Sequence, residues 1–416
     1  MENLSDNLEN KEIIMAAITG EDKPGLTSRL AGIIAQYGAT ILDIGQADIH
    51  NSLSLGIMFI SDQSQSGNIL KEMLFSSSEM GVQVRFSPVS IAEYEKWVSM
   101  QGKNRYIVTL LGRKISAALI ADVSKVLAEQ SLNIDAITRL TGRIPLSDNA
   151  GQHLTRACVE MSVRGTPKDK PLLQSEFMRL SREQGYDISF QEDNLYRRNR
   201  RLVCFDMDST LIQTEVIDEL AMRAGVGDQV KAITESAMRG EIDFCESFKR
   251  RVSLLKGLDE SVMKEIAENL PITEGAARTL KILKQYGYKI AILSGGFNYF
   301  GNYLKQKFNL DFVYANELEI VDGKLTGNYV GEIVDGKRKA ELLKLIAQIE
   351  NLNLQQVIAV GDGANDLPML NCAGLGIAFH AKPKVKENAK QSISSIGMDG
   401  VLYMLGFKDS YIEEKK

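Results

Sequence analysis

Three short polar segments, each directly after an apolar run, hold the residues of this chain best suited to chemistry. They are D-M-D-S-T at 206–210 after LVCF, S-G-G at 294–296 after KIAIL, and G-D-G-A-N-D at 361–366 after VIAV, with Lys339 between the last two. Carboxylates that gather without a counter-charge repel one another and are costly to bury. A divalent cation removes this cost, and Asp206, the backbone carbonyl of Asp208 and Asp362 offer the hard oxygen ligands that Mg²⁺ prefers. The pattern therefore predicts a magnesium site.

The elements that must position these residues alternate between strands and helices from about Arg200. The expected strands are LVCF, KIAIL, FVYANELEI, VIAVG and LGIAF, and a long helical region at 215–269 separates the first two. Strands that are apolar throughout and separated by helices indicate a parallel sheet covered on both faces. Active sites of such sheets lie at the carboxyl ends of the strands. The three polar segments fall at those ends.

The four motifs together resemble the haloacid dehalogenase superfamily, and their spacing from about Leu202 to Gly406 is similar to that of its phosphoserine phosphatase family. Each motif alone is short enough to occur by chance, but all four in this order are specific. The resemblance implies an α/β fold, a Rossmann-like haloacid dehalogenase domain at 200–416 with a helical cap at about 214–285, and Mg²⁺ as cofactor.

The resemblance also implies the chemical roles. Asp206 would attack phosphorus and form an aspartyl-phosphate, while Asp208 would protonate the leaving oxygen and later take a proton from the hydrolytic water. The Ser294 hydroxyl and the Gly295 N–H would hold phosphate oxygens, and Lys339 would offset charge on the transferring group.

Other residues of the same motifs would act less directly. Asn365 would reach the phosphate, and Asp366 would orient Lys339 or a metal-bound water. Ser209 and Thr210 have a second interpretation as caps of the following helix, and for Ser209 we expect that role.

Four cap residues match the family's substrate pocket. Free phosphoserine carries an ammonium and a carboxylate, so a selective pocket needs one acidic and one basic group. Glu215 matches the amine ligand, Arg251 the carboxylate clamp, and Met238 and Phe244 the apolar wall. Taken without the family, Met238 and Phe244 would be core residues of the cap, and Glu215 with Arg251 a surface salt bridge.

The N-terminal part contains an internal repeat with a shift of 93 residues, visible as Ile41 and Ile44 against Ile134 and Ile137. Each copy has the order β-α-β-β-α-β, which is typical of an α+β ferredoxin-like sandwich. We expect the copies at 1–98 and 103–194, with the polar segment SDNAGQH between two strands of the second.

The turn at 20–25 of the first copy, G-E-D-K-P-G, leads into a helix and resembles that of an ACT domain. Free N–H groups at such a helix start can hold a carboxylate. The resemblance implies an amino-acid effector, with L-serine as the candidate, at Asp22, Pro24 and Gly25. The alternative is a packing or dimerisation module without a ligand, and the second copy lacks the turn.

The composition limits the remaining classes. The chain has 416 residues, 44% hydrophobic, 25% charged, with a net charge of −5, which suits two or three globular domains and excludes a largely disordered chain. This charge gives no footprint for nucleic acid or an anionic membrane. No apolar stretch is long enough to cross a bilayer, so we expect a cytoplasmic protein.

The sequence thus predicts a Mg²⁺-dependent phosphatase that converts O-phospho-L-serine to L-serine and phosphate, the last step of serine biosynthesis. We expect a homodimer with no nucleic-acid or membrane partner. Two alternatives stay open. One is a phosphatase of another small phosphomonoester, and the other is an amino-acid sensor whose phosphatase domain is inert.

Overall fold

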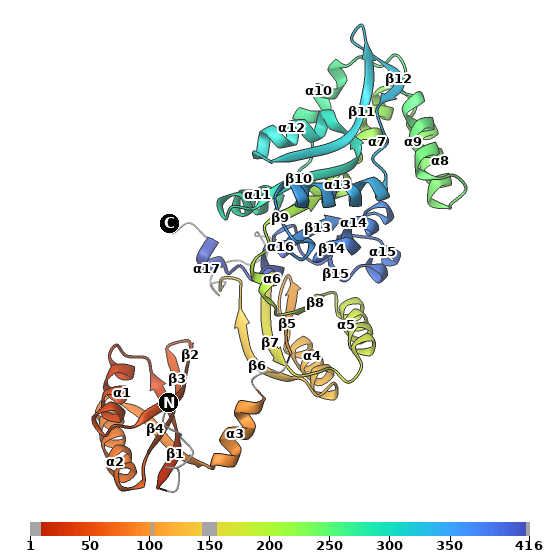
Figure 1. Ribbon diagram of the computed structural model, residues 1–416. Helices are drawn as coiled ribbons and strands as arrows, with labels where there is room; N and C mark the ends of the chain where they lie inside the picture. The colour runs from red at the N-terminus through yellow and green to blue at the C-terminus, as the bar shows by residue number, and fades with distance from the viewer. Residues whose placement is uncertain (1–9, 101–103, 144–155, 413–416) are drawn as a thin grey trace. The chain divides into compact units, whose positions relative to one another are not determined.

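The structure of this chain is a computed structural model that describes residues 10–100, 104–143 and 156–412. Two compact units divide the chain, Met1–Lys103 and Asn104–Lys416 (Figure 1). The expected polar segment at 147–153 lies outside the described residues.

The first unit is a four-stranded antiparallel sheet in the order β2-β3-β1-β4, with two helices packed on it. Its elements are β1 (Lys11–Glu21), α1 (Leu26–Gln36), β2 (Thr40–Ile49), β3 (Ser52–Asp62), α2 (Gln63–Glu79), β4 (Val82–Val89) and α3 (Ile91–Ser99). Burial of Ile14, Ala16 and Ile18 follows the two-residue period of a strand. Leu26 and Leu30 supply the matching apolar stripe of α1.

The second unit begins with a sheet of the same kind, in the order β6-β7-β5-β8. Its elements are β5 (Arg105–Gly112), α4 (Ala117–Glu129), β6 (Asn133–Arg139), β7 (Ala157–Arg164), α5 (Lys170–Gln184) and β8 (Asp187–Glu192). Val108 and Leu110 of β5 share a core with Leu119 and Val123 of α4. The predicted ferredoxin-like order is confirmed for both copies.

A seven-stranded sheet in the order β12-β11-β10-β9-β13-β14-β15 follows in the same unit. Its strands are β9 (Leu202–Phe205), β10 (Lys289–Phe297), β11 (Phe312–Val321), β12 (Lys324–Val330), β13 (Val357–Gly361), β14 (Leu375–Phe379) and β15 (Gln391–Ile393). All neighbours pair in parallel except β11 and β12, which pair antiparallel. The predicted parallel sheet is confirmed, whereas β12 and β15 were not expected.

Helices cover both faces of this sheet. The helices of this part of the chain are α6 (Leu195–Arg198), α11 (Ala276–Gln285), α12 (Asn298–Phe308), α13 (Gly336–Ile349), α14 (Leu367–Cys372), α15 (Pro383–Asn388), α16 (Asp399–Met404) and α17 (Asp409–Ile412), with short turns η2 (Met207–Leu211), η3 (Leu354–Gln356) and η4 (Ala364–Asp366). Alternate residues of β9 face opposite cores. Leu202 and Cys204 join the core of α13 and α14, while Val203 and Phe205 join that of α11 and α16.

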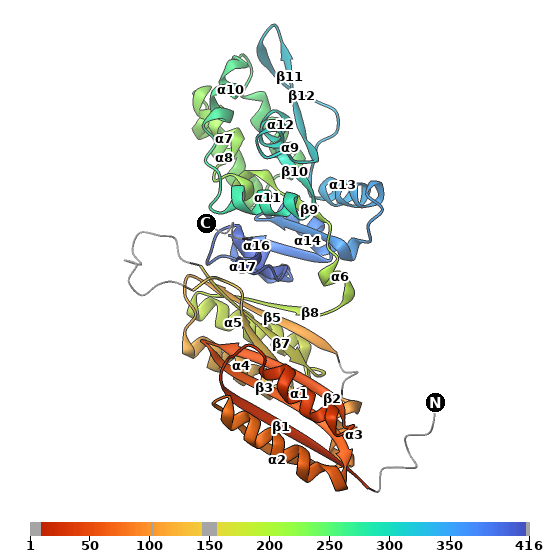
Figure 2. The ribbon, with the colours of Figure 1, turned by 90° about the vertical axis from the view of Figure 1, so that its left-hand side faces the viewer.

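A helical cap is inserted after η2. It contains α7 (Val216–Arg223), α8 (Gly227–Met238), α9 (Phe244–Ser253) and α10 (Ser261–Glu268), which cluster at one end of the unit (Figures 1 and 2). The chain leaves and returns at Ile212 and Ile272, which form an antiparallel bridge. Among the described residues, no helix has the length and apolar character required to span a bilayer.

Candidate active site

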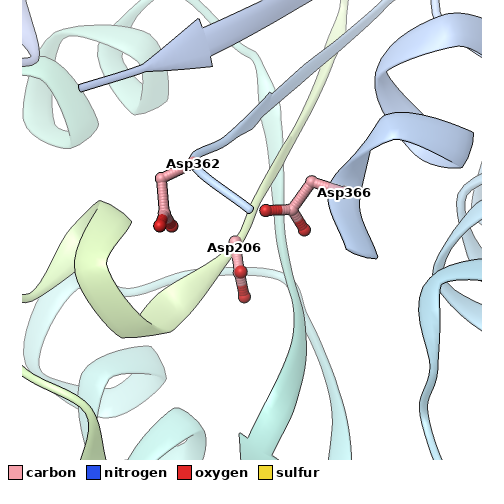
Figure 3. A group of neighbouring side chains, drawn as sticks. All are labelled: Asp206, Asp362 and Asp366. Atoms are coloured by element: carbon pink, nitrogen blue, oxygen red, sulfur yellow. The ribbon is translucent and has the colours of Figure 1, made fainter. Parts of the chain in front are cut away.

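Three carboxylates converge beyond the carboxyl ends of β9 and β13. Asp206 follows β9, Asp362 follows β13, and Asp366 lies in η4. One oxygen from each lies within 4.8 Å of the others, and Figure 3 shows the side chains directed into a common space. Parallel neighbouring strands end at the same edge of the sheet, which brings together residues 156 positions apart in the sequence.

Lys339 lies in the first turn of α13 and is fully buried. Its Nζ is 2.9 Å from Asp206 Oδ2 and 2.7 Å from Asp366 Oδ1. The other Asp366 oxygen accepts the Gly363 N–H at 2.9 Å. A buried ammonium is stable only when it is paired, so these two carboxylates explain how Lys339 is accommodated. Asp366 holds both Lys339 and the 361–366 loop in place.

Asp208 lies in the turn η2, which begins directly after Asp206. Its Oδ1 accepts the Val216 N–H at 3.0 Å, and its Oδ2 lies 3.4 Å from Ser294 Oγ. The backbone of Gly296 passes so close that a Cβ there would lie 2.2 Å from Asp208 Oδ2. Position 296 of the S-G-G segment therefore needs glycine because Asp208 packs against it, which the sequence alone does not show.

The pKa values of these carboxyl groups follow from their surroundings. Burial, followed by repulsion from Asp366, raises the pKa of Asp206 well above its usual range, and Lys339 acts against this rise. Burial and the Glu215 carboxylate raise the pKa of Asp208 to about 8. Burial and Asp366 raise the pKa of Asp362 to about 7. Each upward shift means that burial and neighbouring carboxylates disfavour the ionised form of the group.

This donor set fits a divalent cation. Two buried carboxylates and the half-buried Asp362, paired with Lys339, leave an excess of negative charge once ionised. Hard oxygen donors in small number suit Mg²⁺. The side-chain group contains Asp366 where the sequence suggested Asp208. The ligand atom expected of Asp208 is its backbone carbonyl, and both Asp366 oxygens are already engaged with Lys339 and Gly363.

Glu215 and Arg251 face the same region from the cap. Glu215 Oε1 accepts the Ser209 hydroxyl at 2.7 Å. Arg251, on α9, is partly buried; burial lowers its pKa, and the charges of Glu215 and Asp218 oppose that shift. An acidic and a basic group thus lie near Asp208, the arrangement expected for a substrate with two charged ends.

Phe244 and Met238 differ in their surroundings. Phe244 begins α9 and stacks against Phe248, and its Cζ is 3.0 Å from the position that a Cβ on Gly295 would take. Met238, at the end of α8, is 67% exposed, and its sulfur accepts from Lys382 Nζ at 3.6 Å. Phe244 therefore lies over the S-G-G loop, whereas Met238 lies at the surface and is no core residue of the cap.

Ser209 and Thr210 do not cap a helix. The next helix, α7, has Glu215 at its N-cap. Ser209 has a positive φ of 54° and directs its hydroxyl to Glu215, while Thr210 donates to Asp362 Oδ1 at 2.9 Å. The expectation of a helix cap was wrong because the positive φ of Ser209 directs its side chain toward Glu215. Such a strained backbone conformation is typical of functional loops.

Asn316 is a site residue that the sequence did not suggest. It is buried in β11, donates to the Gly295 carbonyl at 2.8 Å and accepts the Val334 N–H at 2.8 Å. The sequence does contain an indication of this role: a polar asparagine inside the apolar run FVYANELEI, since a buried amide needs hydrogen-bond partners.

The remaining predicted residues lie as follows. Ser294 is buried and its Oγ accepts the Gly296 N–H at 2.9 Å. Asn365, half-buried, lies in η4 between Asp362 and Asp366. The turn with Asp22, Pro24 and Gly25 belongs to the first unit, where all three are exposed and Gly25 precedes α1 with a φ of 92°.

Comparisons with known proteins agree with this geometry. Residues 200–374 match the haloacid dehalogenase-like hydrolase family, and residues 12–87 match the ACT domain. The phosphoserine phosphatase SerB2 of Mycobacterium tuberculosis is 37% identical, over 97% of this chain and 95% of the relative. The phosphoserine phosphatase of Streptomyces coelicolor is 38% identical, over 96% and 93%. A crystal structure of a probable phosphoserine phosphatase from Vibrio cholerae superimposes with a TM-score of 0.57 at 35% identity, covering 73% of this chain and 86% of that one.

Proposed function

The chain belongs to the phosphoserine phosphatase family of haloacid dehalogenase-like hydrolases, and from this premise we propose which residues carry the reaction. Asp206 is the nucleophile and Asp208 the general acid and base in the hydrolysis of O-phospho-L-serine to L-serine and phosphate. The convergence of Asp206, Asp362 and Asp366 around the buried Lys339 is the observation that carries the proposal.

In the first step, a carboxylate oxygen of Asp206 forms a bond to phosphorus while the bond from phosphorus to the serine oxygen breaks. Asp208 gives its proton to that oxygen, and a pKa of about 8 keeps it protonated at neutral pH. In the second step, Asp208 takes a proton from water as the water oxygen displaces Asp206 from phosphorus. Phosphate leaves, and both carboxyl groups return to their starting states.

The other residues hold the phosphoryl group. The Ser294 hydroxyl, the Gly295 N–H and Asn365 bind its oxygens, and Lys339 offsets charge on Asp206. Asp206, Asp362 and the Asp208 carbonyl would hold Mg²⁺, which when bound supplies positive charge beside the attacking carboxylate. Asp366 orients Lys339.

The cap selects the substrate. We assign the ammonium of phosphoserine to Glu215 and its carboxylate to Arg251, while Phe244 and Met238 close over the bound molecule. Closure would exclude water during the first step and admit it for the second. The exposure of Met238 suits a residue that becomes covered only on closure.

The decisive measurement is phosphate release from L-phosphoserine with and without Mg²⁺, for the native chain and for Asp206→Asn. We expect release that requires both Mg²⁺ and Asp206. Activity that survives Asp206→Asn would sink the proposal, and its absence from the native chain would favour the inert sensor.

Substrate choice has its own test. Arg251→Ala should raise KM for phosphoserine by about tenfold or more, since it removes a charge-assisted hydrogen-bond donor. It should leave the hydrolysis of a small phosphate ester without a carboxylate nearly unchanged. Equal rates for unrelated esters and an indifferent Arg251 would instead indicate a broader phosphomonoesterase.

Regulation belongs to the first unit. We propose that Asp22, Pro24 and Gly25 bind L-serine, and that the N–H groups exposed at the start of α1 hold its carboxylate. We further propose that the chain forms a homodimer. Titration with L-serine, comparing Asp22→Ala with the native chain, tests the first point, and sedimentation tests the second. An unchanged response in Asp22→Ala would exclude this turn as the effector site.

A further inference from the structure

The cap is attached to the phosphatase sheet by two crossing segments that pair with each other. Ile212 and Ile272 form an antiparallel bridge. The Gln213 N–H donates to the Pro271 carbonyl at 2.8 Å, and the Thr273 N–H donates to the Leu211 carbonyl at 3.0 Å. We call this pair, residues 211–215 and 271–275, the cap hinge. It begins where the catalytic turn η2 ends, so the position of the hinge affects both the cap and Asp208.

Glu274 lies near the end of the returning segment, and its backbone is tightly enclosed. Its carbonyl accepts the Met398 N–H at 2.8 Å. A Cβ on Gly397 would lie 2.5 Å from that carbonyl, and a Cβ on Gly275 would lie 2.3 Å from Asp399 Oδ2. The end of the hinge is therefore wedged against the segment that precedes α16.

The side chain of Glu274 is held from outside the phosphatase sheet. Arg113 Nη1 and Nη2 donate to its two carboxylate oxygens at 2.7 Å each, the paired geometry of a strong charge-assisted contact. These hydrogen bonds lower the pKa of Glu274. Arg113 directly follows β5, in the ferredoxin-like module formed by β5–β8, and it enters the turn that corresponds to residues 20–25 of the first copy.

That module is itself fixed to the phosphatase sheet. Asp187 of β8 accepts the N–H groups of Ser394 and Ser395 at 2.8 Å each. The Gln391 side chain pairs with the backbone of Phe190, donating to its carbonyl at 2.9 Å and accepting its N–H at 3.3 Å. Arg113 thus projects from an anchored support, so its contact transmits the position of the module to the hinge.

Space for hinge movement exists beside this contact. A cavity of about 260 Å³ lies there, and Ser209, Gln213 and Glu274 are among the residues that line it. The cavity borders the catalytic turn, the outgoing segment and the returning segment at once. A hinge with open volume on one side can shift toward that side, while the backbone of Glu274 stays held by Met398 on the other.

We propose that Arg113 is a positioning residue for the phosphatase reaction: by holding Glu274 it sets the equilibrium between open and closed cap. The turn proposed as the effector site in the first copy serves in the second copy as a mechanical support for the cap. This inference rests on the proposed function of the same site. A support of this kind changes the fraction of molecules that can bind substrate and leaves the chemical groups unaltered.

The test compares Arg113→Ala, Glu274→Gln and the double variant. Each single change should raise KM for phosphoserine about threefold to fivefold, the effect of one partly exposed ion pair. The double variant should be no worse than either single one, because both remove the same contact. Arg113→Lys, which keeps the charge and loses the paired geometry, should fall between. Hydrolysis of p-nitrophenyl phosphate, which lacks the charged groups that the cap binds, should change little.

Arg179→Ala is the matched control, since Arg179 in α5 of the same module pairs only with exposed Glu176 and Glu183 among the contacts that the structure describes. It should leave KM unchanged. Unchanged KM in both single variants, additive effects in the double variant, or an equal loss with Arg179→Ala would overturn the inference. Asp206→Asn separates the two proposals, because its activity tests the chemistry alone.

Discussion

Asp206 and Asp208 are separated by one residue, yet their side chains contact different partners. Asp206 contacts the buried ammonium of Lys339, which favours the ionised form. Asp208 contacts an N–H group and a hydroxyl and faces Glu215, so its pKa rises to about 8. Burial raises the pKa of both carboxyl groups, so it is the contact with Lys339 that distinguishes the proposed nucleophile from the proposed general acid.

At the same scale, the proposed role of Asp362 as a Mg²⁺ ligand predicts how stabilisation of the fold by Mg²⁺ depends on pH. Its pKa is about 7 in the folded chain, against about 4 for an unfolded aspartate. Because the folded state keeps a proton that the unfolded state has lost, the free energy of unfolding without metal falls between about pH 4 and pH 7. Mg²⁺ needs the carboxylate, so it should raise Tm more at about pH 8 than at about pH 5.5.

Thermal unfolding at both pH values, with and without Mg²⁺, checks this prediction. Asp362→Asn is the control, because it removes the ionisable group of the proposed ligand and should abolish most of the Mg²⁺ effect at the higher pH. Equal Tm increments at the two pH values would contradict it.

Gly296 gives a second prediction for single residues. Replacing it with Ala places a methyl group 2.2 Å from Asp208 Oδ2, so either the loop or the carboxyl group must move. A displacement of about 1 Å costs about a hundredfold in rate, and we expect kcat of Gly296→Ala to fall by that order. Steady-state kinetics measures it. Gly227→Ala, where the nearest atom lies at 3.8 Å, is the control and should retain native kcat.

At the scale of elements, β11 does more than extend the sheet. Asn316 connects it to the S-G-G loop through the Gly295 carbonyl and to the segment before α13 through the Val334 N–H. A single buried amide thus fixes two loops that follow different strands of the sheet. Hydrogen bonds of this kind determine geometry as much as stability.

Asn316→Ala should destabilise the chain by about 1–3 kcal/mol, because the buried Val334 N–H and the half-buried Gly295 carbonyl both lose their partner. It should also lower kcat/KM for phosphoserine. Asn316→Asp keeps the acceptor for Val334 and loses the donor to Gly295, which allows the two contributions to be separated. Chemical denaturation and steady-state kinetics measure the effects. Native stability in Asn316→Ala would show that these contacts are replaced by others.

The same scale shows which elements were missed. The hairpin of β11 and β12 turns at Asp322 and Gly323, a dipeptide typical of two-residue hairpin turns, and that signal was overlooked. β15 has only three residues and pairs with β14 at the sheet edge, so no pattern in the sequence announces it.

At the scale of the molecule, the second unit joins a ferredoxin-like module to the phosphatase sheet. Asp187 is central to this junction. Three donors reach its Oδ2, the N–H groups of Ser394 and Ser395 at 2.8 Å and the Ser395 hydroxyl at 2.5 Å. Burial raises the pKa of Asp187, and these donors counteract the rise. The Asp187 carboxylate therefore binds the segment of Ser394 and Ser395 and holds it against β8.

Asp187→Ala should weaken the junction by roughly 2–4 kcal/mol, since it leaves buried donors unpaired. Calorimetry should show the transition of the second unit broadening or dividing as the module separates from the sheet. Glu183→Ala, an exposed position on α5 of the same module, should change stability by less than about 0.5 kcal/mol. A native calorimetric profile for Asp187→Ala would show that the module is held by other contacts.

The sequence by itself determined the fold class, the repeat and the residues most suited to chemistry, because each depends on local periodicity or on motifs of a few residues. The individual site roles and the domain limits at 1–98, 103–194 and 200–416 stay predictions, as does the cap at about 214–285. The bridge at Ile272 favours an earlier end for that cap. Only the tertiary structure decided that Ser209 supports Glu215, that Asn316 holds the S-G-G loop and that Arg113 grips Glu274. Such contacts depend on how distant turns and strands pack against one another. Arg113 and Glu274, for example, are 161 positions apart, and no local sequence pattern predicts that they meet.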